Sequence, residues 1–267
     1  MSRRPGNEKR NFFVEYILPV LFPVLLLGLW EWVSVSRIVS PAILPPPSRI
    51  FTTFCSLLAK GDVARHMSAS LYRVLSGFVL GSLAGLVLGI LVGLSHKIDK
   101  ATGLIINVLR PIPVIALIPL FIIWMGIDEE SKIAVITVGA FWAVLMNTTY
   151  GIKGADKKLI ELAYVLKKNR LETLFMIILP SALPSIFSGI RLGIGNAWAC
   201  VVAAEMIAAS SGVGFLVMFA REVSQSDVMM VGILLIGIFG LLIDSVLVMI
   251  QKRFLRWGAL GTDKKNG

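Results

Sequence analysis

Polar loops divide the chain into apolar stretches that are each about as long as a membrane crossing. A helix needs about 20 mostly apolar residues to cross the hydrocarbon core of a bilayer. Six stretches meet this requirement: 17–35, 75–94, 104–127, 133–150, 186–209 and 228–250. Since 56% of the 267 residues are apolar and only 16% are charged, a soluble domain of this size could not bury the apolar side chains. We therefore predict an all-α, polytopic membrane protein with six transmembrane helices, folded as one domain over 1–267.

Lysine and arginine are distributed unequally over the predicted loops. One side of the membrane carries 17 of the 26 basic residues, in the tail 1–16, the loop around His96, the loop 151–184 and the tail 251–267. The other side carries seven, among them Arg73, and Arg110 and Arg191 lie within apolar stretches. Loops rich in basic residues stay in the cytoplasm, so we expect both termini to be cytoplasmic in a bacterial inner membrane. This topology and attraction to anionic membrane lipid explain the net charge of +10 without any nucleic acid.

The amino-terminal tail resembles the basic region of a secretory signal, because four basic residues precede the first apolar run. The run from Ile17 is long enough to span the membrane, however, and no convincing small-residue cleavage site follows it. We expect an uncleaved first helix.

Cysteine and histidine are too few and too scattered for a metal site or a disulfide framework. The chain has only Cys55, Cys200, His66 and His96. We assign all four to packing or to the surface and expect no metal and no cofactor in this chain.

The outer connection 36–72 is the longest segment on its side of the membrane. Three prolines end at Pro47, Ser48 could cap a helix, and apolar residues then recur at helical spacing up to Gly61. We predict an amphipathic helix that lies on the outer interface or against the bundle. Contact with a binding protein is the alternative.

Five glycines in the second span recur at every fourth position: Gly77, Gly81, Gly85, Gly89 and Gly93. Each costs about 1 kcal/mol of helix propensity relative to alanine, so something must compensate. Small residues at this interval form a groove in which another helix can approach backbone to backbone. We predict close helix packing within the subunit, with a dimer contact as the alternative.

The third span contains Arg110, Pro111, Pro113 and Pro119. Prolines remove backbone donors and bend helices. In one interpretation an interfacial helix ends at Arg110 and the true span begins at Pro111. In the other, Arg110 belongs to a cytoplasmic gate and helps to attract an anion.

The fifth span carries polar and aromatic residues on one helical face, at Arg191, Gly195, Trp198, Val202 and Glu205. Ionisable residues inside a membrane usually face the bundle interior or a wet cavity. Arg191 and Glu205 are about 21 Å apart along a helix, so each needs its own partner. The face, with Asn196 beside it, lines the translocation path or a dimer interface, or else braces the bundle. Asp244 in the last span is interpreted as a structural partner of a nearby basic residue.

The loop 151–184 is predicted to form two short helices. The first has an apolar stripe at Leu159, Leu162, Ala163 and Leu166. Asn169 with Glu172 matches a capping box that would start the second helix, and Pro180 with Pro184 is expected to break the chain before the fifth span. Such a knob could fit the groove of a cytoplasmic partner.

Glu161-Leu-Ala163, followed at a fixed distance by Ile177-Ile-Leu179-Pro180, resembles the EAA signature of permease subunits of binding-protein-dependent ABC importers. Further motifs resemble the sulfonate, taurine and nitrate branch of that family: Leu44 to Ser48, Arg110 to Pro113, Trp124 to Gly126, Leu179 to Pro184, Gly189 to Gly193, Ala203 to Ala208 and Ser211 to Gly214. Two residues depart from the signature, Leu162 in place of alanine and Lys167 in place of glycine. The turn would then be made without glycine, with Asn169 adopting the unusual dihedral angles.

The resemblance implies a homodimer of this chain with two cytoplasmic ABC ATPase subunits and a periplasmic or lipoprotein solute-binding protein. ATP and Mg would bind the partner ATPase, and this chain contains no G-x-x-x-x-G-K-[ST] phosphate loop. The cytoplasmic coupling helix would contact the ATPase through residues of the signature: Glu161, Leu162, Ala163, Leu166, Lys167, Asn169, Leu179 and Pro180. The expected path residues are Arg110, Arg191, Asn196, Trp198 and Glu205.

The expected solute is a small anion, with an aliphatic sulfonate or taurine favoured over nitrate, bicarbonate or another small organic solute. A secondary transporter would need coupling carboxylates at mid-membrane, for which only Glu205 is a good candidate, and often has inverted repeats. A membrane-embedded enzyme would need a nucleophile with its base, or a metal motif, and both histidines lie outside the apolar spans.

Overall fold

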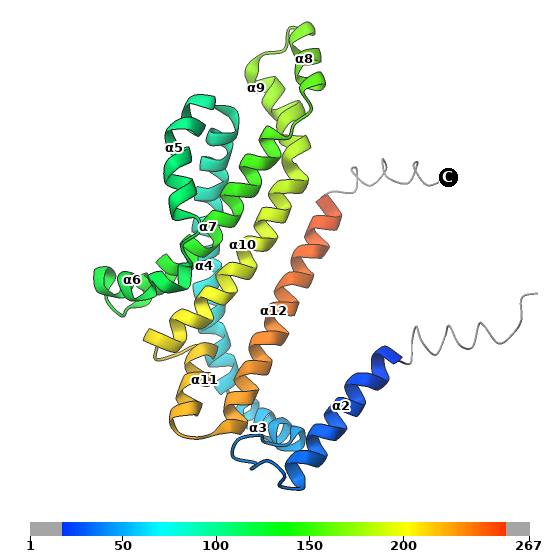
Figure 1. The fold of residues 1–267 in the computed structure, drawn as a ribbon, viewed down its shortest axis with the longest axis vertical. Coiled ribbons are helices and arrows are strands. Elements are labelled where there is room, and N and C mark those ends of the chain that lie inside the picture. The colour runs from blue at the N-terminus through cyan, green and yellow to red at the C-terminus, as the bar shows by residue number, and fades with distance from the viewer. Residues whose placement is uncertain (1–17, 255–267) are drawn as a thin grey trace, which may run out of the picture. The chain divides into compact units, whose positions relative to one another are not determined.

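The computed structural model describes residues 18–254, and the regular elements in this range are all helices (Figure 1). Four helical runs are long and apolar enough to cross a membrane: Asp62–Leu94, Glu129–Lys153, Arg170–Ala208 and Ser226–Phe254. They correspond to α4, α7, the run that ends in α10, and α12. The prediction of an all-α polytopic protein is confirmed. The tail 1–16, with Arg3, Arg4, Lys9 and Arg10, and the tail beyond Phe254 lie outside the described residues.

Helix α4 (Asp62–Leu94) begins well before the predicted span 75–94 and is 33 residues long. Val63, Met67 and Val74 are all buried. The extra turns therefore bury an apolar side of their own. This burial stabilises the helix even where the sequence is too polar to be predicted as a transmembrane segment. The end of this helix at Leu94 agrees with the prediction.

The third predicted span is not one continuous helix. Helix α5 (His96–Leu109) is capped by Ser95, whose side chain accepts a hydrogen bond from the Ile98 backbone, and Arg110 follows its last residue. A short η2 (Val114–Leu117) and α6 (Ile118–Met125) come after Pro111 and Pro113, bent by 82° from α5, and Pro119 lies in the first turn of α6. A helix cannot hydrogen-bond through Pro111 and Pro113, so the predicted helix end at Arg110 is confirmed. The span that starts at Pro111 stays a prediction, and the helical residues that follow are Val114–Met125.

The predicted break at Pro180 and Pro184 is wrong. Helix α9 (Arg170–Thr173) continues through a π-helical turn (Leu174–Ile178) into α10 (Leu179–Ala208). Leu179 donates its backbone hydrogen bond to the carbonyl of Leu174, five residues back. The wider turn lies directly before Pro180, which occupies the first turn of α10, where a missing N–H is tolerated. The second short helix and the transmembrane helix are therefore one rod.

The chain forms two compact units, one with α2 (Leu18–Val35), α3 (Pro47–Ala59) and Leu216–Ile233, the other with Ala64–Phe215 and the rest of α12 (Ser226–Phe254). In the first unit, the predicted amphipathic helix is α3, but Ser48 is not its cap. The residue before the helix is Pro46. The Ser48 hydroxyl and backbone N–H instead donate to the Glu31 carboxylate, at 2.7 and 3.1 Å, and tie α3 to α2.

The second unit is built around α7 (Glu129–Lys153), which lies antiparallel and side by side with α10 (Figure 1). The glycines of α4 face α7 along its length. A Cβ at Gly77, Gly85 or Gly93 would lie 2.7–2.8 Å from atoms of Ile136, Phe141 or Ile152. No side chain fits in this space, so the two backbones are in direct contact.

We expect Gly85→Ala to destabilise the bundle by about 1–3 kcal/mol, because the new methyl group would meet the carbonyl of Phe141 and push the helices apart. The matched control is Gly237→Ala, where none of the described residues would come within 4 Å of the new Cβ. The control should gain up to about 1 kcal/mol of helix propensity. Thermal unfolding in detergent measures both, and equal midpoints for the two variants would contradict the packing argument.

Candidate functional site

The first candidate site is a two-helix knob between α7 and α10. Helix α8 (Lys157–Val165) carries the Glu-Leu-Ala part of the signature. The chain leaves α8 through Lys167, whose φ of +54° lies in the left-handed region. The backbone N–H of Lys168 then reaches back to the carbonyl of Ala163, at 3.0 Å. This bond pattern defines a Schellman end, in which the left-handed position favours glycine.

The expectation that Asn169 makes the unusual turn is wrong, because its φ is −75°. Asn169 instead caps α9. Its side chain accepts from the Glu172 backbone at 2.7 Å, and the Glu172 carboxylate accepts from the Asn169 backbone at 2.9 Å. The predicted capping box is confirmed, and Lys167 itself occupies the strained position at which the signature has glycine.

Large apolar side chains are exposed on both helices of the knob. We call this set the apolar knob surface: Leu159, Leu162, Val165, Leu166, Leu171, Phe175 and Met176, each between 45% and 77% exposed. Ala163 is buried, at 1% exposure, whereas Glu161 is exposed. Exposed apolar groups gathered in this way mark a surface that binds another protein or a membrane.

Lys167→Gly should stabilise the end of α8 by about 1 kcal/mol, because glycine adopts positive φ without the steric cost of a side chain. Hydrogen exchange of the α8 amides measures this effect as slower exchange. Lys168→Gly is the matched control, since Lys168 is not among the described residues with positive φ, and its exchange should become faster. Equal effects of the two glycines would contradict the assignment.

The second candidate site is the exposed face of α10. Its exposed residues are Ser181, Pro184, Ser188, Arg191, Leu192, Gly195, Asn196, Ala199 and, near its end, Ile207. Most of them are small or polar and follow helical spacing. By contrast, the exposed residues of α12 include Ile233, Leu234, Ile238, Leu241, Leu242 and Val246. A helix that faced only lipid would carry residues like those of α12.

Arg191 and Asp244 form a bidentate ion pair between α10 and α12. The distances are 2.6 Å from Nε to Oδ1 and 2.7 Å from Nη2 to Oδ2. Both side chains remain nearly half-exposed, at 47% and 45%. The interpretation of Asp244 as the partner of a basic residue is confirmed. Trp198 is buried and donates its Nε1–H to the Ile236 carbonyl at 3.1 Å, which gives a second polar contact with α12.

Glu205 lies at the other end of α10, inside a closed polar network. Its carboxylate accepts from Arg73 and from Ser70, each at 2.8 Å, and from the Gly214 backbone at 3.0 Å. Its side chain is fully buried. The expectation that Arg191 and Glu205 have separate partners is therefore confirmed, because one pairs with Asp244 and the other with Arg73.

Arg73 is the centre of this network. It also donates to both carboxylate oxygens of Glu129, at 2.5 and 2.7 Å, and to the backbone and hydroxyl oxygens of Ser211. His66 accepts a hydrogen bond from the Gly212 backbone. The network thus joins α4, α7 and the segment after α10 through a single guanidinium.

Sequence reasoning placed Arg73 in an outer loop and did not find this network. The signal was the spacing of His66, Ser70, Arg73 and Gly77, which continues the glycine face of α4 toward its start. Because α4 was predicted to begin at residue 75, that periodicity was not followed upstream.

The remaining predicted residues are dispersed. Arg110 is exposed at the end of α5, Asn196 is exposed on α10, and Leu179 and Pro180 are half-buried where the knob joins α10. The structure thus brings Glu161, Leu162, Ala163 and Leu166 together on the knob. Arg191, Asn196 and Trp198 are grouped on the middle turns of α10.

Arg73→Leu should destabilise the protein by about 3–5 kcal/mol, because it leaves the Glu205 carboxylate buried without a counter-charge. The double variant Arg73→Leu/Glu205→Leu removes both charges and should recover much of the loss. The measurements are the yield of monodisperse protein and the thermal midpoint in detergent. A double variant less stable than the single one would contradict this reason.

The fold and these sites define a polytopic helical membrane protein with an exposed, partly apolar knob and a polar face on one long helix. Residues 81–256 match the sequence profile described as "Binding-protein-dependent transport system inner membrane component". The chain belongs to this family and is a permease subunit of an ABC importer. Membership identifies it as a multi-pass inner-membrane component that works with an ATPase and a solute-binding protein.

Relatives extend the match to nearly the whole chain. The SsuC permease protein of Bacillus subtilis (strain 168), named for aliphatic sulfonates transport, is 38% identical over 96% of this chain and 92% of its own length. The taurine transport permease TauC of Escherichia coli K12 is 36% identical over 87% of this chain and 86% of its own. The MetNI methionine ABC transporter, in an inward-facing structure, shares the fold with a TM-score of 0.64 at 17% identity, covering 74% of this chain and 96% of its own.

Proposed function

We propose that two copies of this permease form the translocation path of an ATP-driven importer for a small anionic solute, with an aliphatic sulfonate or taurine favoured. A solute-binding protein outside the membrane delivers the solute, and two ABC ATPase subunits in the cytoplasm bind and hydrolyse ATP with Mg. The observation that carries this proposal is the apolar knob surface, whose second part, Leu171, Phe175 and Met176, lies on the helical run that continues unbroken into α10.

The knob is the contact for the ATPase. Its exposed leucines and Phe175 give the apolar area that a protein partner would bury, and Glu161 adds a charge at the edge. Ala163 is too deeply buried to be a contact, so its small size serves the packing of α8. Lys167 and Asn169 fix the angle between α8 and the rod that follows, and Leu179 and Pro180 lie within that rod. A movement of the ATPase would then be transmitted from Arg170 to α10 without a break in the helix.

The polar face of α10 is the candidate path. Facing lipid, the exposed Asn196 amide and the open half of the Arg191–Asp244 pair would lack polar surroundings, whereas a wet path or a second copy would provide them. Trp198 and Glu205 serve this face indirectly, by holding α10 against its neighbours. Arg110 is the remaining path candidate, on the segment where α5 bends into α6.

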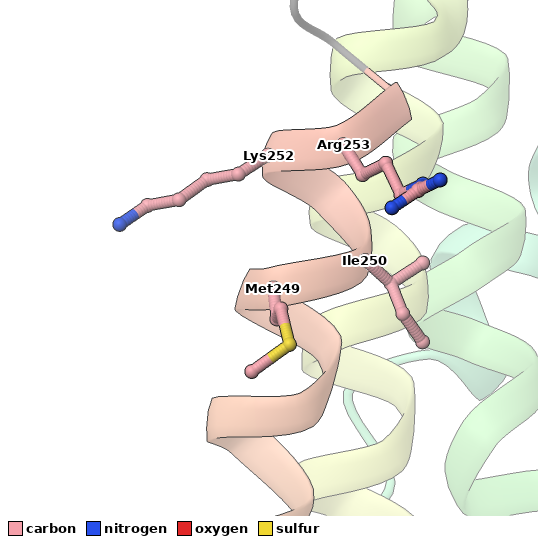
Figure 2. A pocket seen from close by; sticks show the side chains of 4 residues that line it. All are labelled: Met249, Ile250, Lys252 and Arg253. Atoms are coloured by element: carbon pink, nitrogen blue, oxygen red, sulfur yellow. The ribbon is translucent and has the colours of Figure 1, made fainter.

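The orientation follows from the charge distribution. Figure 2 shows Lys252 and Arg253 pointing to opposite sides at the last turn of α12, in the turn that also holds Met249 and Ile250. Basic residues that follow an apolar run are typical of the cytoplasmic interface. The knob loop is also rich in lysine, and Lys153 pairs with Asp99 at 2.6 Å near the start of α5. We place the knob and both termini in the cytoplasm and count six spans.

The solute class follows from the relatives and from charge. The SsuC and TauC relatives are named for aliphatic sulfonates and taurine, and a bicarbonate transport permease, CmpB of Synechocystis, is 32% identical over 88% of this chain. These solutes are anionic or carry an anionic group, and the polar face of α10 offers Arg191. Nitrate, bicarbonate and other small organic solutes are the alternatives, because the binding protein largely sets specificity.

Leu162→Asp should abolish ATP-dependent uptake and reduce recovery of the ATPase with the purified permease by more than tenfold, because it puts a charge into the apolar knob surface. Glu161→Lys, which reverses a charge on the same helix, should also abolish coupled uptake. Lys158→Ala is the control, since it changes an exposed charge of α8 outside that surface.

The measurement combines affinity purification in mild detergent with uptake in vesicles. The thermal midpoint of each variant should stay at the wild-type value, which separates lost coupling from misfolding. Wild-type uptake and ATPase recovery in Leu162→Asp would overturn the assignment of the knob.

A further inference from the structure

The Arg191–Asp244 ion pair is unusually exposed for two charged side chains that lie within predicted transmembrane spans. Arg191 lies five residues inside the predicted start of the fifth span, and Asp244 lies six residues inside the end of the last one. Nearly half of each side chain is nevertheless uncovered by the chain itself. Two charged groups at this depth require water or a polar partner on their open side, because lipid tails offer no hydrogen bonds.

The surroundings of the pair on α10 are open rather than packed. Gly195, one turn farther along, would place a Cβ with none of the described residues within 4 Å, and Asn196 beside it is exposed. Ser188 lies one turn before the pair on the same exposed face. This part of α10 therefore has room for a small solute and polar groups to contact it.

We propose that Arg191 and Asp244 together form an electrostatic selectivity element for the transported anion. Arg191 attracts the anionic group of the solute. Asp244 holds the guanidinium in competition with the solute and so keeps it from binding too tightly to be released. Conduction needs a site that is favourable to enter and still weak enough to leave. The proposal rests on the proposed function in one respect, that this face of α10 lines the path.

A purely structural role predicts something different. If the pair only pinned α12 to α10, then Arg191→Gln and Asp244→Asn would break the same bonds and have effects of the same sign. If the pair is a selectivity element, the two variants change the attraction of the anion in opposite directions. Arg191→Gln removes the positive charge and weakens the attraction, whereas Asp244→Asn removes the negative charge and strengthens it.

The test uses a cysteine at Gly195→Cys as a reporter, in the full importer complex in native membrane vesicles. The two native cysteines are first replaced, Cys55→Ser and Cys200→Ala. Two thiol reagents of similar size are compared, the anionic 2-sulfonatoethyl methanethiosulfonate and the cationic 2-(trimethylammonium)ethyl methanethiosulfonate. The ratio of their reaction rates reports the electrostatic potential along the face and depends on no assumption about the natural solute.

We expect both reagents to react, with the anionic-to-cationic rate ratio rising about tenfold in Asp244→Asn and falling about tenfold in Arg191→Gln. The neutral double variant should return to within about twofold of the parent ratio, which also guards against misfolding of either single variant. Three results would overturn the proposal: no reaction with either reagent, an unchanged ratio, or shifts of the same sign in both single variants.

Uptake of ethanesulfonate by the same vesicles separates this proposal from the assigned solute. Arg191→Gln should raise KM, whereas Asp244→Asn should lower both KM and kcat because the anion leaves more slowly. Failure of the wild-type complex to take up ethanesulfonate or taurine would overturn the sulfonate assignment. The labelling ratios show whether the pair sets the potential along an accessible face, and KM shifts of the same sign in the two variants would overturn its role in selectivity.

Discussion

The direct backbone contact between α4 and α7 is the constraint on which the rest of the second unit depends. In lipid there is no hydrophobic drive between helices, since the acyl chains are as apolar as leucine, and close packing must replace it. Five glycines at intervals of four remove every side chain that could hold the two helices apart. With α7 fixed against α4, α10 can pack along another side of α7, where Gly189 and Gly193 again bring its backbone close to Asn147 and Val144.

The same face of α4 carries glycines that pack against α7 from Gly77 to Gly93, and polar and charged side chains near its amino terminus. Toward the amino terminus from Gly77, this face carries Arg73, Ser70 and His66, which bind Glu205 and the segment around Gly212. Gly212 has φ of +116°, and a side chain there would collide with the Glu205 carboxylate. The buried charge thus accepts from Ser70, Arg73 and the Gly214 backbone, which replace the hydrogen bonds that it would make with water. One end of the bundle is fixed by a saturated network, and the other end carries the exposed knob.

Sequence patterns predicted the helices and most of the knob, because those depend on local rules. The glycine period, the capping box at Asn169 and the helix end before Pro111 are each readable within a few residues. The sequence did not reveal what depends on distant contacts. Arg73 could be placed only by knowing how far α4 extends, and the partner of Glu205 is 132 residues away. The continuity of α9 with α10 was missed because proline normally ends a helix, whereas here a π-helical turn precedes Pro180 and the helix continues.

That continuity limits how the knob can work. If Pro180 and Pro184 had formed a flexible break, a force on α8 would bend the chain before it reached the membrane. Because residues 170–208 form one helical run, rotating the knob must rotate α10 and with it the face that carries Arg191. The strained backbone at Lys167 lies just before this rod, between α8 and α9. It is the remaining place where the angle between α8 and the rod can change. Lysine in place of glycine makes this left-handed turn less stable, so the angle between α8 and the rod is held by the bonds on either side of it, from Lys168 to Ala163 and within the Asn169 capping box.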